Sequence, residues 1–414
     1  MGLHWRSMRC VYGGSADSNK EVQLEGEMQR FTRLRVSGYK SFVDVELPLR
    51  PLAVMIGPNG CGKTSLLELI WLFNQAMQED LTKAIEQQGG INSIVSRLSP
   101  EPSQMEFELA YYTEDFQGEE DMIYRVHLSA DLRERPIRLE QLERRFNPTA
   151  STPYRYIDAQ NDRVRYAEPG ETGFVTPTWD YHNNELALAQ IPRMYKDPER
   201  LRSALAQARF YSFLDVQPRS VVRLPQSLTP TLRPGPNGEN LFSALYNLRA
   251  SHEGLYRSLE NVLRIGFPGF RRLEFPVVGS GQVTLGWFQE GLEGPLYPNE
   301  LSEGTLRFLW LSTVLLSPSA APITCIDEPE VSLHPELLKL LAGLLQDASM
   351  RGQYIVATHS AELIRWLNPE EVLVMEKEEG KSSFTWADSL DLHEWLKEYT
   401  LDQLWLMGTL GGRP

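Results

Sequence analysis

Apolar positions along the first half of the chain predict strands leading into one helix, followed by further strands. FTRLRVSGYKSF and DVELPL alternate like two strands, and PLAVMI is a short buried strand that ends in a glycine-rich turn. The stretch from Thr64 to about Ile85 has helical spacing. Alternation then predicts antiparallel strands at 104–112, 121–130 and 137–145, with another at 155–167.

The second half returns to helices and then to alternating strands and helices. Helical spacing covers 185–210 and 238–264, and strands are predicted at 272–278 and 282–289. A helix at 303–316, the strand PITCI, a helix at 335–348 and the strand YIVAT follow. This order predicts an α/β core interrupted by a helical lobe. We divide the chain into a loose leader (1–29), a first lobe (30–185), a helical insertion or lid (186–275), a second lobe (276–376) and a C-terminal tail that packs on the second lobe (377–414).

Composition excludes several classes of protein. Hydrophobic residues make up 42% and charged residues 23% of the 414 residues, which is typical of globular chains. No run approaches the roughly 20 apolar residues of a membrane-spanning helix, and the N-terminus lacks the apolar core of a signal peptide. The 3 cysteines are too few for a disulfide framework or a zinc site. We expect a soluble cytoplasmic protein with no membrane association.

The net charge of −14 argues against a surface that coats nucleic acid uniformly. The stretch 191–233 nevertheless carries 8 Arg and Lys against 3 acids. It is either an ordinary solvated surface or a local contact for DNA, and both explanations stay open.

The strongest motif is a complete G-x-x-x-x-G-K-T phosphate loop between a predicted strand and a predicted helix. Its glycines let backbone N–H groups converge on phosphate oxygens, and the helix N-terminus adds the positive end of its dipole. Lys63 then reaches the β- and γ-phosphates, and the Thr64 hydroxyl binds Mg²⁺. The residues expected to contact the nucleotide are Gly57, Pro58, Asn59, Gly60, Cys61, Gly62, Lys63, Thr64 and Ser65.

Two acids follow the apolar strand ITCI, at the end of the strand where ligands bind in open α/β sheets. Asp327 is expected to hold Mg²⁺, and Glu328 to orient the attacking water, because phosphoryl transfer depends on positioning and charge neutralisation. His359 follows the strand YIVAT directly. A histidine there is either structural or a hydrogen-bonding partner of the γ-phosphate or the water.

A third motif, Leu-Ser-Glu-Gly-Thr, opens the helix at 303–316. Ser302 and Gly304 form another candidate anion site at a helix N-terminus, although an ordinary helix cap also explains them. This third motif is not obviously part of the site that contains Lys63, Asp327, Glu328 and His359.

Together these motifs resemble the ATPase heads of the ABC type, in the SMC, RecF and OLD branch. The likeness is strongest to stand-alone AAA family ATPases (AAA_21-like) related to the OLD group. It rests on VSGYKSFxDVEL, GPNGCGKT, PGPNGENL, LSEGTLR, IDEPEVSLHP and ATHS. It implies a P-loop head with a mixed sheet, an antiparallel β-subdomain and a short helical insertion in place of a long coiled coil. No Asp-x-Asp pair follows Glu376, so a Toprim nuclease domain is not expected.

The resemblance implies that two heads pair head to tail around ATP and Mg²⁺. Ser302 and Gly304 then act on the partner's nucleotide, Glu328 is the catalytic carboxylate, and His359 senses the γ-phosphate. A lid glutamine touches Mg²⁺, for which Gln190 is the candidate, and Lys40 and Ser41 meet the nucleotide near the first strand.

The expected function is an ATP-hydrolysing switch that controls a separate nuclease or toxin-like effector, as the sensor of an anti-phage defence system. The alternative is a RecF-like ATPase of DNA repair. It would bind DNA through the basic stretch, with contacts from Arg193, Arg200, Arg202, Arg209, Arg219 and Arg223. A scaffold that scarcely hydrolyses ATP is disfavoured, because it would not need Glu328.

Overall fold

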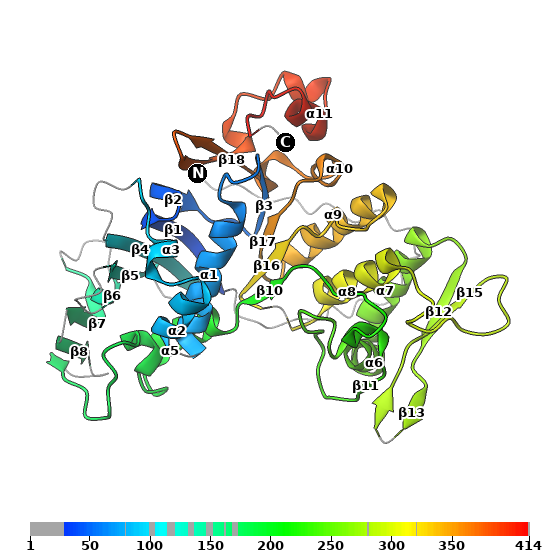
Figure 1. Ribbon diagram of the computed structural model, residues 1–414, viewed down its shortest axis with the longest axis horizontal. Helices are drawn as coiled ribbons and strands as arrows, with labels where there is room; N and C mark the ends of the chain where they lie inside the picture. Colours follow the sequence, from blue (N-terminus) through cyan, green and yellow to red (C-terminus); the bar gives the residue numbers. More distant parts are fainter. Residues whose placement is uncertain are drawn as a thin grey trace.

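The fold is built on two large β-sheets with helices between and beyond them (Figure 1). The computed structural model describes residues 29–78, 80–98, 104–113, 121–130, 136–145, 152–160, 163–167, 173–279, 281–319 and 321–412. The predicted leader therefore lies outside the described residues, apart from Gln29, which begins the first strand. No helix in these ranges is long and apolar enough to cross a membrane.

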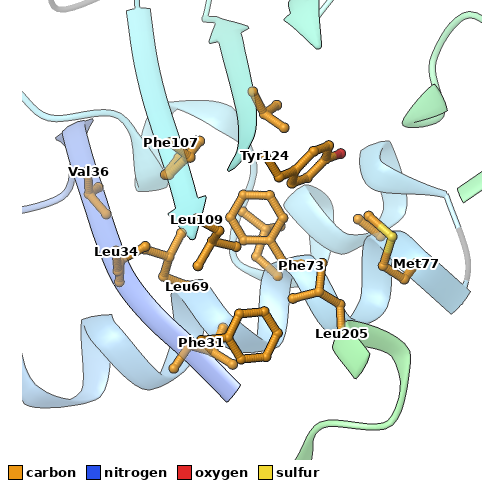
Figure 2. Packing of buried hydrophobic residues seen from close by; sticks show 14 of the residues in the cluster. Phe31, Leu34, Val36, Leu69, Phe73, Met77, Phe107, Leu109, Tyr124 and Leu205 are labelled. Atoms are coloured by element: carbon orange, nitrogen blue, oxygen red, sulfur yellow. The ribbon is translucent and has the colours of Figure 1, made fainter. Parts of the chain in front are cut away.

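The first sheet has eight strands in the order β2-β1-β4-β5-β6-β7-β8-β9, and every neighbouring pair is antiparallel. Its strands are β1 (Gln29–Tyr39), β2 (Phe42–Pro48), β4 (Gln104–Thr113), β5 (Met122–Ser129), β6 (Ile137–Arg144), β7 (Tyr154–Gln160), β8 (Arg163–Ala167) and β9 (Phe174–Val175). Strict alternation in β4 turns Phe107 and Leu109 toward helix α1 (Lys63–Gln78). There the Phe73 ring meets the rings of Phe107 and Tyr124 (Figure 2).

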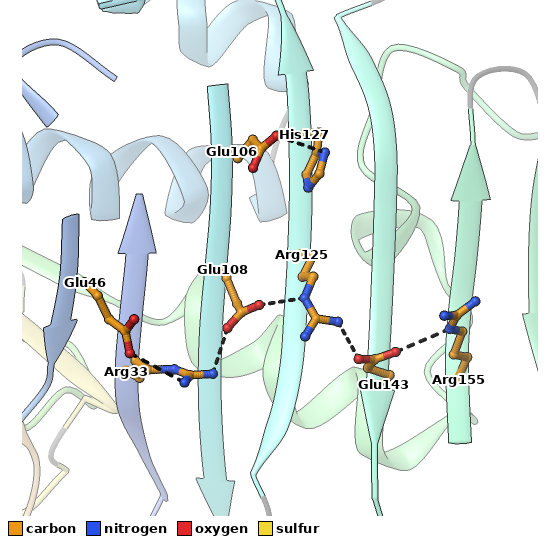
Figure 3. Close-up of polar contacts among 8 residues, drawn as sticks. All are labelled: Arg33, Glu46, Glu106, Glu108, Arg125, His127, Glu143 and Arg155. Atoms are coloured by element: carbon orange, nitrogen blue, oxygen red, sulfur yellow. Dashed lines mark hydrogen bonds and ion pairs between the residues drawn. The ribbon is translucent and has the colours of Figure 1, made fainter. Parts of the chain in front are cut away.

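The opposite face of this sheet is charged (Figure 3). Glu108 accepts from Arg33 at 2.7 Å and from Arg125 at 2.6 Å, and Glu143 pairs with Arg125 and, at 3.3 Å, with Arg155. Opposite charges thus alternate across neighbouring strands. Such partly exposed pairs each contribute little to stability. The charges largely cancel, so this face is an ordinary solvated surface.

The second sheet has six strands in the order β10-β16-β17-β3-β18-β19. They are β3 (Leu52–Ile56), β10 (Arg209–Tyr211), β16 (Ile323–Asp327), β17 (Gln353–Ala357), β18 (Val372–Glu378) and β19 (Lys381–Trp386). All pairs are parallel except β18 with β19. Along β3, Ala53 and Met55 join one hydrophobic core, while Leu52, Val54 and Ile56 join the other. The sheet is therefore covered on both faces, as parallel sheets usually are.

Helices divide between these two cores. Residues of α1, α2 (Leu81–Gln87) and α5 (Lys196–Ala206) belong to the core shared with the eight-stranded sheet. The second core contains α6 (Leu241–Ser251), α7 (Glu253–Gly266), α8 (Glu303–Leu316), α9 (Pro335–Ser349) and α11 (Leu401–Leu406). The smaller elements are α3 (Ile91–Ile94), α4 (Ala187–Gln190), α10 (Ala361–Ile364), β11 (Gln226–Ser227), β12 (Phe270–Glu274), β13 (Val277–Gly279), β14 (Gln282–Val283) and β15 (Gly286–Gln289).

The predicted mixed α/β class with an antiparallel β-subdomain is confirmed, and no coiled coil occurs among the described residues. The single helix over 64–85 is wrong, because Asp80 caps a new helix by accepting from the Thr82 N–H at 2.7 Å. The range 185–210 contains two helices and then β10, and the predicted strands over 272–289 are four short ones. The lobe boundaries stay a prediction, although β3 and β10 join the same sheet from different predicted lobes.

Candidate functional site

The phosphate loop joins β3 to α1, at the carboxyl end of a central strand. Gly57, Gly60 and Gly62 have φ values of 148°, 76° and 110°, which favour glycine. A Cβ on Gly57 would lie 2.2 Å from the Met375 carbonyl oxygen, and one on Gly62 would lie 2.9 Å from the Phe42 ring. The loop is therefore held between β18 and the β1–β2 turn, with its backbone leading directly into the α1 N-terminus.

Lys63 is buried, with 6% of its surface exposed. Its ammonium donates to the carbonyl oxygens of Gly57 at 2.6 Å and Pro58 at 3.2 Å. Burial lowers the pKa of Lys63, while the nearby charges of Asp327 and Glu328 act in the opposite direction. The cation therefore lies over the loop with its charge directed to the place where phosphates are expected.

Two carboxylates leave β16 at the same edge of the sheet. Asp327 ends the strand, and Glu328 follows with a φ of 48°, its N–H donating to the Ala357 carbonyl at 2.8 Å. Burial raises the pKa of Asp327, and the charges of Glu328 and Glu330 add to this rise. The left-handed backbone of Glu328 costs on the order of 1–3 kcal/mol, and such strain concentrates at functional sites.

These residues suit a hard divalent cation. Mg²⁺ prefers oxygen ligands, and it is usually bound by one or two carboxylates together with phosphate oxygens and water. Asp327 supplies the carboxylate, and the exposed Thr64 side chain supplies a hydroxyl at the start of α1. The donor set therefore fits Mg²⁺ held together with a nucleotide.

His359 lies next to this acid pair. Its Nε2 is 3.9 Å from Glu328 Oε1. Burial and the charge of Lys63 lower the pKa of His359, while the charges of Glu328 and Asp327 act in the opposite direction. Glu330, which the sequence analysis missed, accepts from the His359 backbone N–H at 2.7 Å and fixes this turn. The signal was present as the third acid of Asp-Glu-Pro-Glu.

Ser302 and Gly304 begin α8. The Ser302 hydroxyl accepts from the Thr305 N–H at 3.1 Å, so Ser302 is a helix cap. A Cβ on Gly304 would lie 2.6 Å from the Ser332 carbonyl oxygen, so packing within the chain already requires glycine. Among the described residues, no hydrogen bond or ion pair joins Ser302 or Gly304 to the phosphate loop. The structure brings Lys63, Asp327, Glu328 and His359 together and leaves the α8 N-terminus separate from them.

Lys40 and Ser41 form the turn between β1 and β2, beside the phosphate loop. Lys40 pairs with Glu68 of α1. The Ser382 hydroxyl lies 2.7 Å from the Ser41 hydroxyl and 2.6 Å from the Cys61 carbonyl oxygen, so it connects the turn to the loop. A cavity of about 310 Å³ opens here, lined by basic and small polar residues that include Lys40, Ser41, Asn92, Arg97 and Lys377. The nucleotide contacts of Lys40 and Ser41 stay a prediction.

Gln190 lies on α4, away from the group formed by Lys63, Asp327, Glu328 and His359. Its side chain is bound within its own segment, accepting from the His182 N–H at 2.7 Å and donating to the His182 carbonyl at 2.9 Å. Its role as a metal ligand stays a prediction.

Strand β10 pairs with β16 up to Ile326, so the residues after Tyr211 leave the sheet beside Asp327.

The C-terminal segment also reaches the phosphate loop, which the sequence did not indicate. The Gly412 N–H donates to Glu376 at 3.0 Å, and its carbonyl accepts from the Trp405 indole. A Cβ on Gly412 would lie 3.0 Å from the Met375 carbonyl oxygen and 3.3 Å from the Gly57 Cα. The last described residues therefore brace the first glycine of the loop.

Comparisons with known proteins agree with this geometry. Residues 52–365 match the family model AAA_21, described as "AAA domain, putative AbiEii toxin, Type IV TA system". A chromosome partition protein Smc from Cereibacter sphaeroides is 51% identical over 49 residues, which are 11% of this chain and 4% of that protein. An OLD nuclease from Thermus scotoductus is 47% identical over 38 residues, which are 9% of this chain and 7% of that protein. The chain therefore spans only a small part of these relatives.

Solved structures share the fold. A Smc head bound to the C-winged helix domain of ScpA superposes with a TM-score of 0.52 at 14% identity, over 86% of this chain and 97% of that one. A Smc head with an extended coiled coil from Pyrococcus furiosus, bound to the C-terminal domain of ScpA, gives 0.52 at 13% identity, over 90% and 100%. At this level of identity the likeness concerns the fold alone.

Proposed function

Because the chain belongs to the AAA_21 family of AAA domains, we propose that it is an ATP-hydrolysing switch in which two copies close head to tail around ATP and Mg²⁺. It is an ATPase of the SMC, ABC and AAA kind. The observation that carries the proposal is the convergence of Lys63, Asp327, Glu328 and His359 at the carboxyl edge of β3, β16 and β17.

The chemistry follows from what these groups do. Lys63 exchanges the carbonyl oxygens of Gly57 and Pro58 for phosphate oxygens. Thr64 and Asp327 would hold Mg²⁺, which would neutralise charge on the phosphates. Glu328, whose side chain is 53% exposed, orients a water for attack on the terminal phosphate. His359 donates a hydrogen bond to that phosphate or to the water.

Pairing of two copies accounts for the α8 N-terminus. A helix N-terminus with an exposed serine suits an anion, and the phosphate loop of the same chain makes no hydrogen bond or ion pair with it among the described residues. A second copy would bring its nucleotide to Ser302 and Gly304. ATP would then close the pair, and hydrolysis would open it.

The switch is proposed to control a separate nuclease or toxin-like effector in anti-phage defence, within the cytoplasm. Three comparisons support control of a separate effector. The family description names a toxin, one relative is an OLD nuclease, and Smc heads were solved with ScpA as a separate partner.

The alternative is a DNA-binding ATPase that uses the stretch 191–233. Here the arginines are partly committed within the chain. Arg202 pairs with Glu199 at 2.5 Å, and Arg223 donates to the carbonyls of Val216 at 2.6 Å and Leu301 at 3.0 Å. Arg193, Arg209 and Arg219 remain exposed. This favours the effector-controlling switch over a dedicated DNA surface.

The steady-state ATPase rate, measured with and without linear double-stranded DNA, tests the choice. We expect a low rate that DNA does not change, with Glu328→Gln as the background control. A several-fold stimulation by DNA that disappears as salt rises would contradict the proposal and support the DNA-binding alternative.

A further inference from the structure

One buried cation near the start of α8 has two nitrogens without a hydrogen-bond partner among the described residues. Arg307 is only 4% exposed, and these nitrogens are its Nε and Nη2. Its guanidinium carbon lies 4.2 Å from the centroid of the Phe213 ring, and the charge of Glu303 lies one turn earlier. Burying a charge without hydrogen bonds is unfavourable, and a cation–π contact offsets only part of that cost. Unsatisfied buried groups of this kind call for a functional explanation.

The position of Arg307 on α8 suggests a role in binding an anion. It lies three residues after Gly304 and so on the same side of α8. Phe213, which covers it, is 63% exposed and follows β10 at the edge of the sheet where Asp327 ends β16. The exposed Phe213 ring therefore lies over the guanidinium, beside the helix N-terminus that already suits an anion.

We propose that Arg307 binds phosphate when two copies pair. The second copy displaces Phe213, which exposes Arg307, and presents the terminal phosphate of its bound ATP. This rests on the proposed head-to-tail pairing. The guanidinium offers several N–H donors in a planar fork that matches phosphate oxygens. The Ser302 hydroxyl and the free N–H groups of α8 supply the remaining contacts.

We assign this phosphate to the ATP bound by a second copy of the chain. The phosphate loop of the same chain begins α1, whose buried side chains belong to one core, while α8 belongs to the core on the other face of the six-stranded sheet. No described part of the chain offers Arg307 this ligand, so we assign it to a second copy. Phe213 keeps the site covered until it arrives, so that pairing depends on ATP.

The test uses Arg307→Met in a Glu328→Gln background, where bound ATP persists. Sedimentation equilibrium with ATP and Mg²⁺ should show dimerisation weakened by about 10- to 100-fold, since hydrogen bonds to a charged group are lost. Binding of a fluorescent ATP analogue to the monomer should not change. The thermal midpoint without nucleotide should stay the same or rise, because an apolar side chain replaces an unpartnered buried charge.

Two further variants sharpen this test. Phe213→Ala should strengthen ATP-dependent dimerisation several-fold, because no ring has to be displaced. Arg272→Met is the matched control, since Arg272 also lies over a ring, Phe288, at 4.0 Å, but on the β12–β15 hairpin. It should leave dimerisation unchanged.

The outcomes separate this inference from the proposed function. If the Glu328→Gln parent dimerises with ATP and Arg307→Met dimerises equally well, the role of Arg307 is wrong and the pairing stands. If Arg307→Met lowers the thermal midpoint and monomer ATP binding together, Arg307 is structural. Equal weakening with and without ATP would mean that the anion is a protein carboxylate. A parent that never dimerises overturns both.

Discussion

The N-termini of α1 and α8 have the same kinds of groups but differ in how completely the chain satisfies them. At α1, the Lys63 ammonium has two carbonyl acceptors, and Gly57 is braced by Met375 and Gly412. At α8, Ser302 caps the helix, but two nitrogens of the Arg307 cation have no acceptor among the described residues. The groups at α1 are thus satisfied within the chain, whereas those at α8 are only partly satisfied. In the proposed dimer, each helix end supplies one half of a composite site.

Removing the cation at α1 should have the largest effect. Lys63→Ala loses the charge-assisted phosphate contacts, so ATP affinity should fall at least about 100-fold. Isothermal titration calorimetry measures it, with Lys339→Ala, a surface lysine over Trp366, as control. Tight ATP binding by Lys63→Ala would mean that α1 is not the nucleotide site.

Mixing two inactive variants tests whether α8 serves the other copy. Ser302→Arg should block the half-site while leaving α1 intact, so each variant alone should hydrolyse little ATP. A 1:1 mixture of Ser302→Arg with Lys63→Ala should recover about a quarter of the wild-type rate, because half of the dimers carry one intact site of two. If no mixing ratio restores activity, the two helix ends do not act between copies.

The two helix ends also differ in how far the sequence predicts them. The phosphate loop, Asp327, Glu328 and His359 were recognisable because each follows a buried strand directly, and parallel strands bring their carboxyl ends together. Arg307 was not recognisable, since an arginine inside a helix usually indicates a solvent-facing position. The Phe213 ring that lies over it comes from the segment after β10, far away in the sequence.

The fold shows the same limit. Long periodic elements such as α8 and α9 were predicted to within a residue. The three-residue strand β10 was hidden in a range with helical spacing, because so short a strand shows no alternation and is defined by pairing with β16. The capping signal of Asp80 was present in the sequence and was overlooked.

A smaller change should weaken ATP binding at the N-terminus of α1 without affecting α8. Gly412→Ala adds a Cβ 3.0 Å from the Met375 carbonyl oxygen and 3.3 Å from Gly57, so the loop must shift by a few tenths of an ångström. We expect a several-fold loss of ATP affinity with little effect on the thermal midpoint. Gly412 itself has a φ of 53°, so the matched control is Gly291→Ala, which has a φ of 82° and no atom within 4 Å of its Cβ. Unchanged ATP affinity in Gly412→Ala would show that the C-terminal segment does not support the loop.

The smallest expected effect lies away from both helix ends. Buried Glu140 accepts from Tyr124 at 2.7 Å and from the N–H groups of Ala187 and Leu188, and burial raises its pKa to about 7. A raised carboxyl pKa means that the folded state binds the proton more tightly, so stability falls as pH rises from about 4.5 to about 7. Urea unfolding at pH 5 and pH 8 should show this loss, about 1–3 kcal/mol, in the wild type but not in Glu140→Gln. Exposed Glu106→Gln is the control, and an equal pH dependence in Glu140→Gln would contradict the assignment.

The central claim is that a complete site needs both helix ends, from two copies. Sedimentation equilibrium of Glu328→Gln with ATP and Mg²⁺, with ADP, and without nucleotide tests it most directly. The account predicts a dimer with ATP and a monomer in the other two conditions. A monomer throughout, or the same dimer without nucleotide, would contradict it.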